Sequence, residues 1–119
     1  MRRREGALVP LEVSILEAAL ELRGQGMTEA HGFLLAKTMR DDHHARRLTA
    51  YGTLYKALER LERAGHLVSR WEDPHIGARE GRPRRRLYRV TLIGEGALER
   101  ATEDRRGASA PRAAAIQPS

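Results

Sequence analysis

The sequence contains no cysteine and no long apolar run. A chain without cysteine has no disulfide, no thiolate nucleophile and no cysteine-ligated zinc finger. A membrane-spanning helix needs roughly 18 consecutive apolar residues, and the N-terminal segment reaches Glu12 before a secretory apolar core could form. We therefore expect a cytoplasmic protein with no membrane partner, stabilised by a single hydrophobic core.

Motifs of catalysis and cofactor binding are also missing. No serine stands in an elbow motif, and no glycine-rich loop precedes a phosphate-binding lysine. Possible metal ligands adjoin one another at residues 41–44, but adjacent histidines cannot easily reach one ion from a helix, and no further ligand cluster follows at a matching spacing. The sequence therefore predicts a protein that is not an enzyme and that holds no cofactor and no metal.

Positive charge is in excess. The 119 residues include 22 lysines and arginines against 16 aspartates and glutamates, which gives a formal net charge of +6. The field around such a protein attracts polyanions such as nucleic acid. The length suits one small domain, which we predict over residues 8–106. Small residues and proline predominate over residues 107–119, and this composition predicts a disordered tail.

Apolar residues recur at steps of three and four in the first half of the chain, which predicts three helices. The first is expected over residues 10–24, with Pro10 in its first turn. The second is expected over residues 29–40 behind Thr28 as N-cap, and the third over residues 49–65. Short connections allow these three helices to close into a compact core.

Alternating patterns with β-branched and aromatic residues follow, and they predict two strands, over residues 66–73 and 85–91. Proline, glycine and cations over residues 74–85 predict a long loop between the strands. Trp71 is expected in the core, and the alternative is that it contacts a planar ligand between the hairpin and the fourth helix. Thr91 can cap a fourth helix that ends near Arg106. The predicted fold class is α+β, a winged helix-turn-helix with a three-helix core, a two-stranded β-hairpin wing and a short C-terminal helix.

The third predicted helix has two contrasting faces. At 100° per residue, Leu54 shares a buried stripe with Ala50, Ala57, Leu58, Leu61 and Gly65. The opposite face could simply be solvated, but its first two turns carry hydroxyls and a lysine and no acid, a set that suits contact with phosphates and base edges. The residues of that face are Thr49, Gly52, Thr53, Lys56, Arg60 and Arg63, with Tyr55 and Glu59 toward one flank.

A second basic cluster covers residues 78–89, from the predicted loop into the second predicted strand, and it contains one acid, Glu80. Six like charges so close together repel one another unless an anion is near, so the cluster favours nucleic-acid binding over a role in solubility alone. A guanidinium group at a hairpin tip can reach a phosphate or the minor groove. The arginines are Arg79, Arg82, Arg84, Arg85, Arg86 and Arg89.

The segments "TAYGTLYKALERLERAGHLVSRWED", "GRPRRRLYRVT" and "AHGFLLAK" resemble the PadR-like family of bacterial transcriptional regulators, over roughly residues 11–100. The resemblance implies a winged helix-turn-helix that acts as a homodimer on a near-palindromic operator and represses until a small effector or signal releases it. The DNA-binding residues that the helix face, the arginine cluster and the resemblance together predict are Thr49, Tyr51, Gly52, Thr53, Tyr55, Lys56, Arg60, Arg82, Arg84, Arg85 and Arg86.

Two interpretations of function follow. The first is a sequence-specific regulator of transcription that binds double-stranded DNA, and the second is a small basic adaptor that binds an acidic protein or an anionic surface without reading DNA. The family's dimers commonly use the first helix and a longer C-terminal helix, whereas the fourth helix here is expected to be short. The candidate dimer residues are Leu11, Ile15, Leu22, Leu92, Ala97 and Leu98.

Overall fold

The computed structural model describes residues 7–40 and 51–116, and it places them in an α+β fold of five helices and one antiparallel sheet. No helix within these ranges is long and apolar enough to cross a membrane. The elements are α1 (Pro10–Gly24), β1 (Ala30–His31), α2 (Gly32–Arg40), α3 (Tyr51–Arg63), β2 (Leu67–Trp71), α4 (Pro74–Arg79), β3 (Arg86–Val90) and α5 (Leu92–Ile116).

The sheet has three strands rather than the two of the prediction. Its order is β1-β3-β2, because Ala30 and His31 pair with Tyr88 and Leu87 on the free edge of β3. This pairing displaces the start of the second helix from residue 29 to Gly32, and it corrects the assignment of Thr28 as N-cap. Periodicity in the sequence does not show such a pairing, because the partner strand lies more than fifty residues further along the chain.

The wing is formed by β2 and β3, and both lie where the sequence predicts them. Their register pairs Leu67 with Val90 and Trp71 with Arg86. The long loop predicted between them is wrong, since α4 occupies its first half. The carboxylate of Asp73 accepts a hydrogen bond from the His75 amide at 2.9 Å and so caps this helix.

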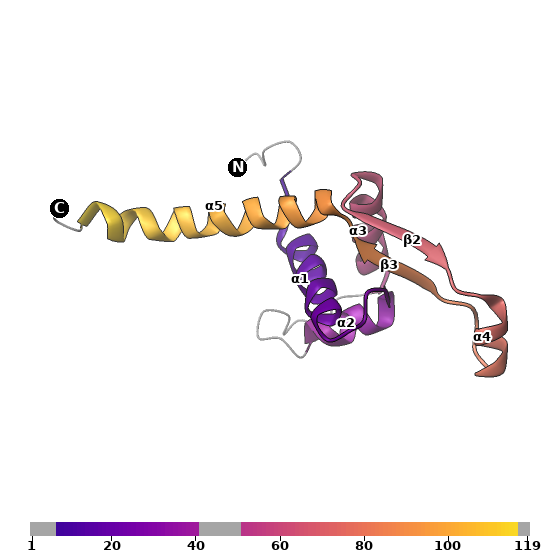
Figure 1. The fold of residues 1–119 in the computed structure, drawn as a ribbon. Coiled ribbons are helices and arrows are strands. Elements are labelled where there is room, and N and C mark those ends of the chain that lie inside the picture. Colours follow the sequence, from indigo (N-terminus) through magenta and orange to yellow (C-terminus); the bar gives the residue numbers. More distant parts are fainter. Residues whose placement is uncertain (1–6, 41–50, 117–119) are drawn as a thin grey trace.

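The last helix is much longer than the prediction. α5 runs for 25 residues to Ile116, whereas the sequence predicted an end near Arg106 and a disordered tail from residue 107. Alanine, the best helix former, fills much of the segment around Pro111 and supports the extension. Figure 1 shows α5 projecting from the body in the direction opposite to the wing, and the molecule measures 64 × 27 × 27 Å along its principal axes.

Leucine side chains from α1, α2, α3 and β2 form the centre of the core. The stripe predicted on α3 is confirmed at Leu54, Ala57, Leu58 and Leu61, which are all buried. It is wrong at Gly65, which follows the end of α3 with a positive φ, and Ala50 lies outside the described residues. The expectation that Trp71 belongs to the core is wrong, since half of its surface is exposed. Trp71 is the last residue of β2, which extends away from α1, α2 and α3 toward α4 (Figure 1).

A polar junction ties the end of α3 to the start of α5. The hydroxyl of Thr91 donates to the Gly65 carbonyl at 2.6 Å and accepts from the Gly94 amide at 3.0 Å, which confirms its expected role as a cap. The Thr91 amide donates to the His66 carbonyl at 3.1 Å. Gly94 lies so close to that carbonyl that a Cβ at this position would overlap it. The junction therefore fixes α5 relative to the helix that carries the candidate site.

His66 makes stability dependent on pH. Its imidazole is buried, and Nδ1 has no hydrogen-bond partner within the described part of the chain. Burial lowers the pKa of His66 from 6.5, and the charge of Arg100 acts in the same direction while that of Glu12 opposes it. The unfolded chain therefore takes up a proton on this imidazole more readily than the folded chain does. The contribution of the neutral imidazole to stability is fully present above pH 6.5 and is lost as the pH falls below that value.

We expect thermal unfolding to occur at a lower temperature at about pH 5 than at about pH 7, with part of the difference due to His66. Replacing His66 with glutamine should reduce the difference, and the remainder includes His31, whose pKa burial also lowers. The same replacement at the exposed His75 is the matched control. A profile that His66→Gln leaves unchanged would contradict the assignment.

Candidate nucleic-acid interface

The exposed face of α3 carries part of the predicted site. Gly52, Thr53 and Lys56 are all exposed, and the first turn of the helix contains no acid. Thr49 lies outside the described residues, and so does the side chain of Tyr51, whose backbone begins the helix. A glycine, a hydroxyl and an amine on one surface allow close approach to a polyanion, hydrogen bonds to it and neutralisation of its charge.

Tyr55 has a second role besides the predicted one. Its side chain is 45% exposed, but its ring covers the start of α2. A Cβ on Gly32 would lie 2.5 Å from the Tyr55 hydroxyl oxygen and 2.8 Å from Cζ, so a larger residue at position 32 would displace this half-exposed ring. Gly32 therefore lets the Tyr55 ring lie against the start of α2.

Arg60 is paired within the chain. Its Nε lies 2.9 Å from Oε2 of Glu12, a carboxylate that is 5% exposed and that also accepts from the Val9 amide at 2.9 Å. A buried carboxylate needs such a counter-charge, because an unpaired one would be costly. Arg60 thus attaches α3 to the start of α1, and it is a weaker candidate for a phosphate contact than Lys56.

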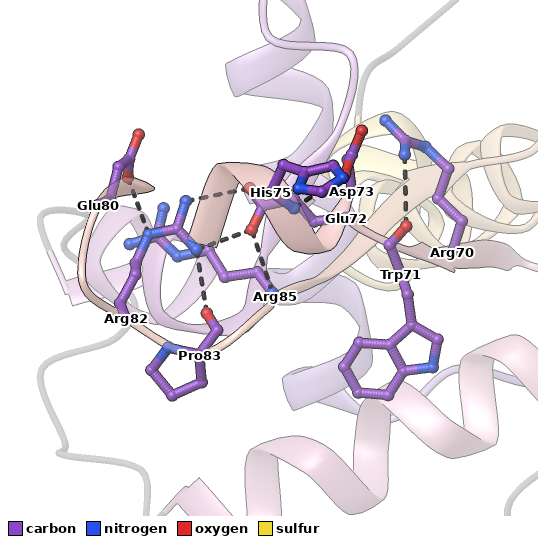
Figure 2. A network of polar contacts seen from close by, with 9 residues as sticks. All are labelled: Arg70, Trp71, Glu72, Asp73, His75, Glu80, Arg82, Pro83 and Arg85. Atoms are coloured by element: carbon purple, nitrogen blue, oxygen red, sulfur yellow. Dashed lines mark hydrogen bonds and ion pairs between the residues drawn. The ribbon is translucent and has the colours of Figure 1, made fainter. Parts of the chain in front are cut away.

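Arg82 is also engaged internally, in the polar network of the wing (Figure 2). Its Nη1 and Nη2 donate to Oε1 and Oε2 of Glu72 at 2.7 and 3.0 Å, and its Nε donates to Glu80 at 2.9 Å. These bonds from Arg82, assisted by the Arg85 amide, lower the pKa of Glu72 to about 2 although burial opposes the shift. Arg82 is only 18% exposed, so it stabilises the wing tip and presents little surface to a ligand.

The other wing arginines differ in how they are held. The Arg85 amide donates to Glu72 at 3.2 Å, and the Arg85 carbonyl accepts from the Glu72 amide at 2.8 Å. Arg86 donates from Nε to the Ser69 hydroxyl at 2.9 Å. Arg84 is exposed, and its guanidinium carbon lies 4.9 Å from the ring centroid of Trp71. Some arginines of the cluster are therefore bonded within the protein, and others can face a ligand.

Sequence reasoning missed Trp71 as a member of this surface. The available signal was its place in the alternation of β2, where it follows Leu67 and Ser69 at steps of two and stands at the last position of the strand. A strand that reaches beyond the core continues the same alternation into solvent. Trp71, the last residue of β2, therefore lies on the inward side of the sheet and is still exposed.

No group of three or more histidine, aspartate or glutamate side chains could hold a metal ion in the part of the chain that the structure describes. The ligands considered in the sequence, at residues 41–44, lie outside that part.

Comparison with known proteins identifies the family. A sequence model of the "Transcriptional regulator PadR-like family" matches residues 20–100. No curated protein sequence matches the chain.

Solved structures share the fold. A transcriptional regulator from Clostridium thermocellum is 20% identical, with 90% of each chain covered and a TM-score of 0.67. A PadR family transcription regulator from Clostridium difficile R20291 is also 20% identical, with 90% of this chain and 98% of that chain covered and a TM-score of 0.67. A PadR-like transcriptional regulator from Bacillus cereus is 19% identical, with 92% of this chain and 93% of that chain covered and a TM-score of 0.63.

The fold is therefore that of a winged-helix regulator, and the family is one of transcriptional regulators and not of enzymes. Because the family model covers most of the chain, including α2, α3 and the wing, the protein belongs to the PadR-like family of transcriptional regulators.

Proposed function

We propose that the protein is a homodimeric regulator that binds double-stranded DNA in a sequence-specific manner. In this proposal the N-terminal half of α3 enters the major groove, and arginines of the wing contact the adjacent backbone. The observation that supports it most is the exposed, acid-free surface of Gly52, Thr53 and Lys56 on α3. The major groove is wide enough to admit an α-helix, whose N-terminal residues then reach base edges.

The wing is placed to cooperate with α3. The Ser69 hydroxyl on β2 donates to Glu62 of α3 at 2.6 Å, so this face of the sheet lies against α3. Arg86 is bonded to the same hydroxyl. Cations on this face would meet the phosphates that flank the groove occupied by α3, and they would supply affinity without regard to sequence.

The dimer is supported by the resemblance to the family and by the shape of α5. Most of the candidate dimer residues that the sequence suggested are buried within the protomer, namely Ile15, Leu22, Ala97 and Leu98. Leu92 is 84% exposed. The part of α5 that projects from the body (Figure 1) offers a surface to a second chain. Analytical ultracentrifugation at micromolar concentration should therefore give the mass of two chains.

Repression that a small effector releases is the regulatory part of the proposal, and it rests on the resemblance alone. In a reporter strain, deletion of the gene should raise transcription from the target promoter. Lower transcription after deletion would instead identify an activator.

Fluorescence anisotropy tests the central claim. Purified protein is titrated into the labelled duplex found upstream of its own gene and into a scrambled duplex of equal length, at near-physiological salt. Tighter binding to the first duplex, saturating at two protomers per site, would support the proposal. Equal binding to both would favour a general polyanion binder, and no binding to either would favour the adaptor that binds an acidic protein.

Thr53 provides the sharpest test of base reading, since its side chain is exposed and no bond within the described residues would be lost. Thr53→Ala should reduce the preference for operator over scrambled duplex by about tenfold while affinity for the scrambled duplex stays unchanged. The same change at the exposed Thr28, in the turn after α1, is the matched control. Equal losses on both duplexes would contradict the role given to Thr53.

A further inference from the structure

Trp71 is the only tryptophan of the chain, and it stands half exposed at the outer end of β2. A tryptophan usually buries most of its large apolar surface, so an indole left in solvent on a small domain calls for a reason. Figure 2 shows the indole pointing away from the network of Glu72 and Arg82, on the other side of the strand. The ring therefore takes no part in the internal ties of the wing tip.

Two guanidinium groups lie over this ring. The central carbon of Arg84 is 4.9 Å from the ring centroid, and that of Arg86 is 5.1 Å from it. A cation within about 6 Å of a tryptophan centroid is attracted by the negative face of the ring. The attraction to Trp71 offsets the repulsion between the two arginines, and it holds both groups in one place.

The position of this cluster follows from the register of the wing. Trp71 pairs with Arg86, and Ser69 pairs with Tyr88, so these side chains share one face of the sheet. Ser69 donates to Glu62 of α3, and the Arg86 guanidinium lies 3.7 Å from the same carboxylate. The face that carries Trp71 is thus the face that lies toward α3. The end of α3 and the cluster are joined through Glu62.

We propose that Trp71 is a positioning residue for DNA binding, which holds the guanidinium groups of Arg84 and Arg86 as one phosphate-binding clamp on the side of the wing that faces α3. The inference rests on the proposed function. It adds Trp71 to the DNA-binding residues and gives the wing arginines different roles. Arg84 and Arg86 contact phosphates, Arg86 while it stays bonded to Ser69 and paired with Glu62. Arg82 stabilises the wing through Glu72 and Glu80.

The physical advantage is preorganisation. A free arginine side chain loses rotamer entropy when it binds a phosphate, and a group already held against a ring loses less. Arg86 is fixed further by its bond to Ser69 at 2.9 Å, whereas Arg84 depends on the ring among the contacts described for its side chain. Loss of the indole should therefore release Arg84 more than Arg86.

A double-mutant cycle on mixed-sequence duplex DNA tests the clamp. Arg84→Ala with Arg86→Ala should lower the slope of log affinity against log salt by about two units, one for each lost phosphate contact. Trp71→Ala alone should weaken binding by about three- to tenfold, because the released arginine must then lose its rotamer freedom when it binds DNA. Trp71→Phe should restore part of the loss, because phenylalanine offers a weaker ring to the same cations.

The decisive comparison is Trp71→Ala in the background that lacks both arginines. If Trp71 acts through Arg84 and Arg86, the third substitution has no further effect on affinity. If the losses simply add, the indole acts independently of the arginines and the proposal is overturned. An unchanged circular dichroism melting curve for Trp71→Ala separates the effect from unfolding, and Trp71→Phe serves where that curve is altered.

Fluorescence of the single tryptophan tests the cluster without DNA. Neutral acrylamide reports how exposed the ring is, whereas iodide is also attracted by cations beside it. The ratio of iodide to acrylamide quenching should therefore be higher in wild type than in the variant without Arg84 and Arg86. An equal ratio in the two proteins would overturn the proposed cluster. Absence of any anisotropy change with duplex DNA would instead overturn the proposed function, so the two failures are distinguishable. On addition of mixed-sequence duplex, iodide quenching of wild type should fall, and unchanged quenching despite binding would contradict the clamp.

Discussion

Replacement of Leu58 with aspartate should abolish the folded domain. Leu58 has no exposed surface, and it lies in the stripe with which α3 packs on the core. An ionised carboxylate at this position would lose its hydration without gaining a counter-charge, at a cost of several kcal/mol. A domain of this size is stable by only about 5–15 kcal/mol, so the substitution removes most or all of that margin. Circular dichroism should show loss of helix and no cooperative melt.

The matched control is Met27→Asp, because Met27 is 46% exposed in the connection after α1. A carboxylate there keeps its hydration, so this variant should melt within a few degrees of wild type. A Leu58→Asp protein that melts as wild type does would show that α3 does not pack through this stripe.

Replacement of Gly94 with alanine should be the second most damaging change. The added Cβ would overlap the His66 carbonyl oxygen, and it would lie 3.0 Å from Cγ1 of Val90. The carbonyl belongs to the backbone between α3 and β2, and it also accepts from the Thr91 amide, so it cannot turn aside as a side chain could. Overpacking of this kind costs about 1–3 kcal/mol and occasionally more. Urea titration should show a clearly lower midpoint.

Gly96→Ala in the same helix is the control. The nearest atom to a Cβ there is Nη1 of Arg100 at 3.6 Å, the far end of a flexible side chain. Alanine is better than glycine in a helix by about 1 kcal/mol, so this variant should be slightly more stable than wild type. Equal midpoints for the two alanine variants would mean that α5 does not approach His66 as closely as the structure shows.

The sequence determined the elements that depend on neighbouring residues. Leucines at steps of three and four predict the buried side of α3, and the structure buries Leu54, Leu58 and Leu61. Alternation predicts β2 and β3, and Thr91 is the cap that the sequence indicates. The exposed positions of Gly52, Thr53 and Lys56 follow from the same helical geometry. In each case the signal lies within a few turns of the chain, where helix and strand periods operate.

Only the tertiary structure decided which arginines are available. The sequence assigned Arg60, Arg82, Arg84, Arg85 and Arg86 alike to DNA, because nothing local distinguishes one guanidinium group from another. Glu12 lies 48 residues from Arg60, and the carboxylate of Glu72, ten residues away, reaches Arg82 only because the wing folds back on itself. A charge is compensated or left for a ligand according to its neighbours in space.

The same reason explains the sheet and Trp71. Ala30 and His31 become a strand only because an edge of β3 is free beside them. Trp71 is exposed because β2 extends past α1, α2 and α3. The alternation of residues along the strand does not indicate how far the strand extends. Pairing between distant segments is fixed when the whole chain packs, since hydrogen bonds and counter-charges are then satisfied together.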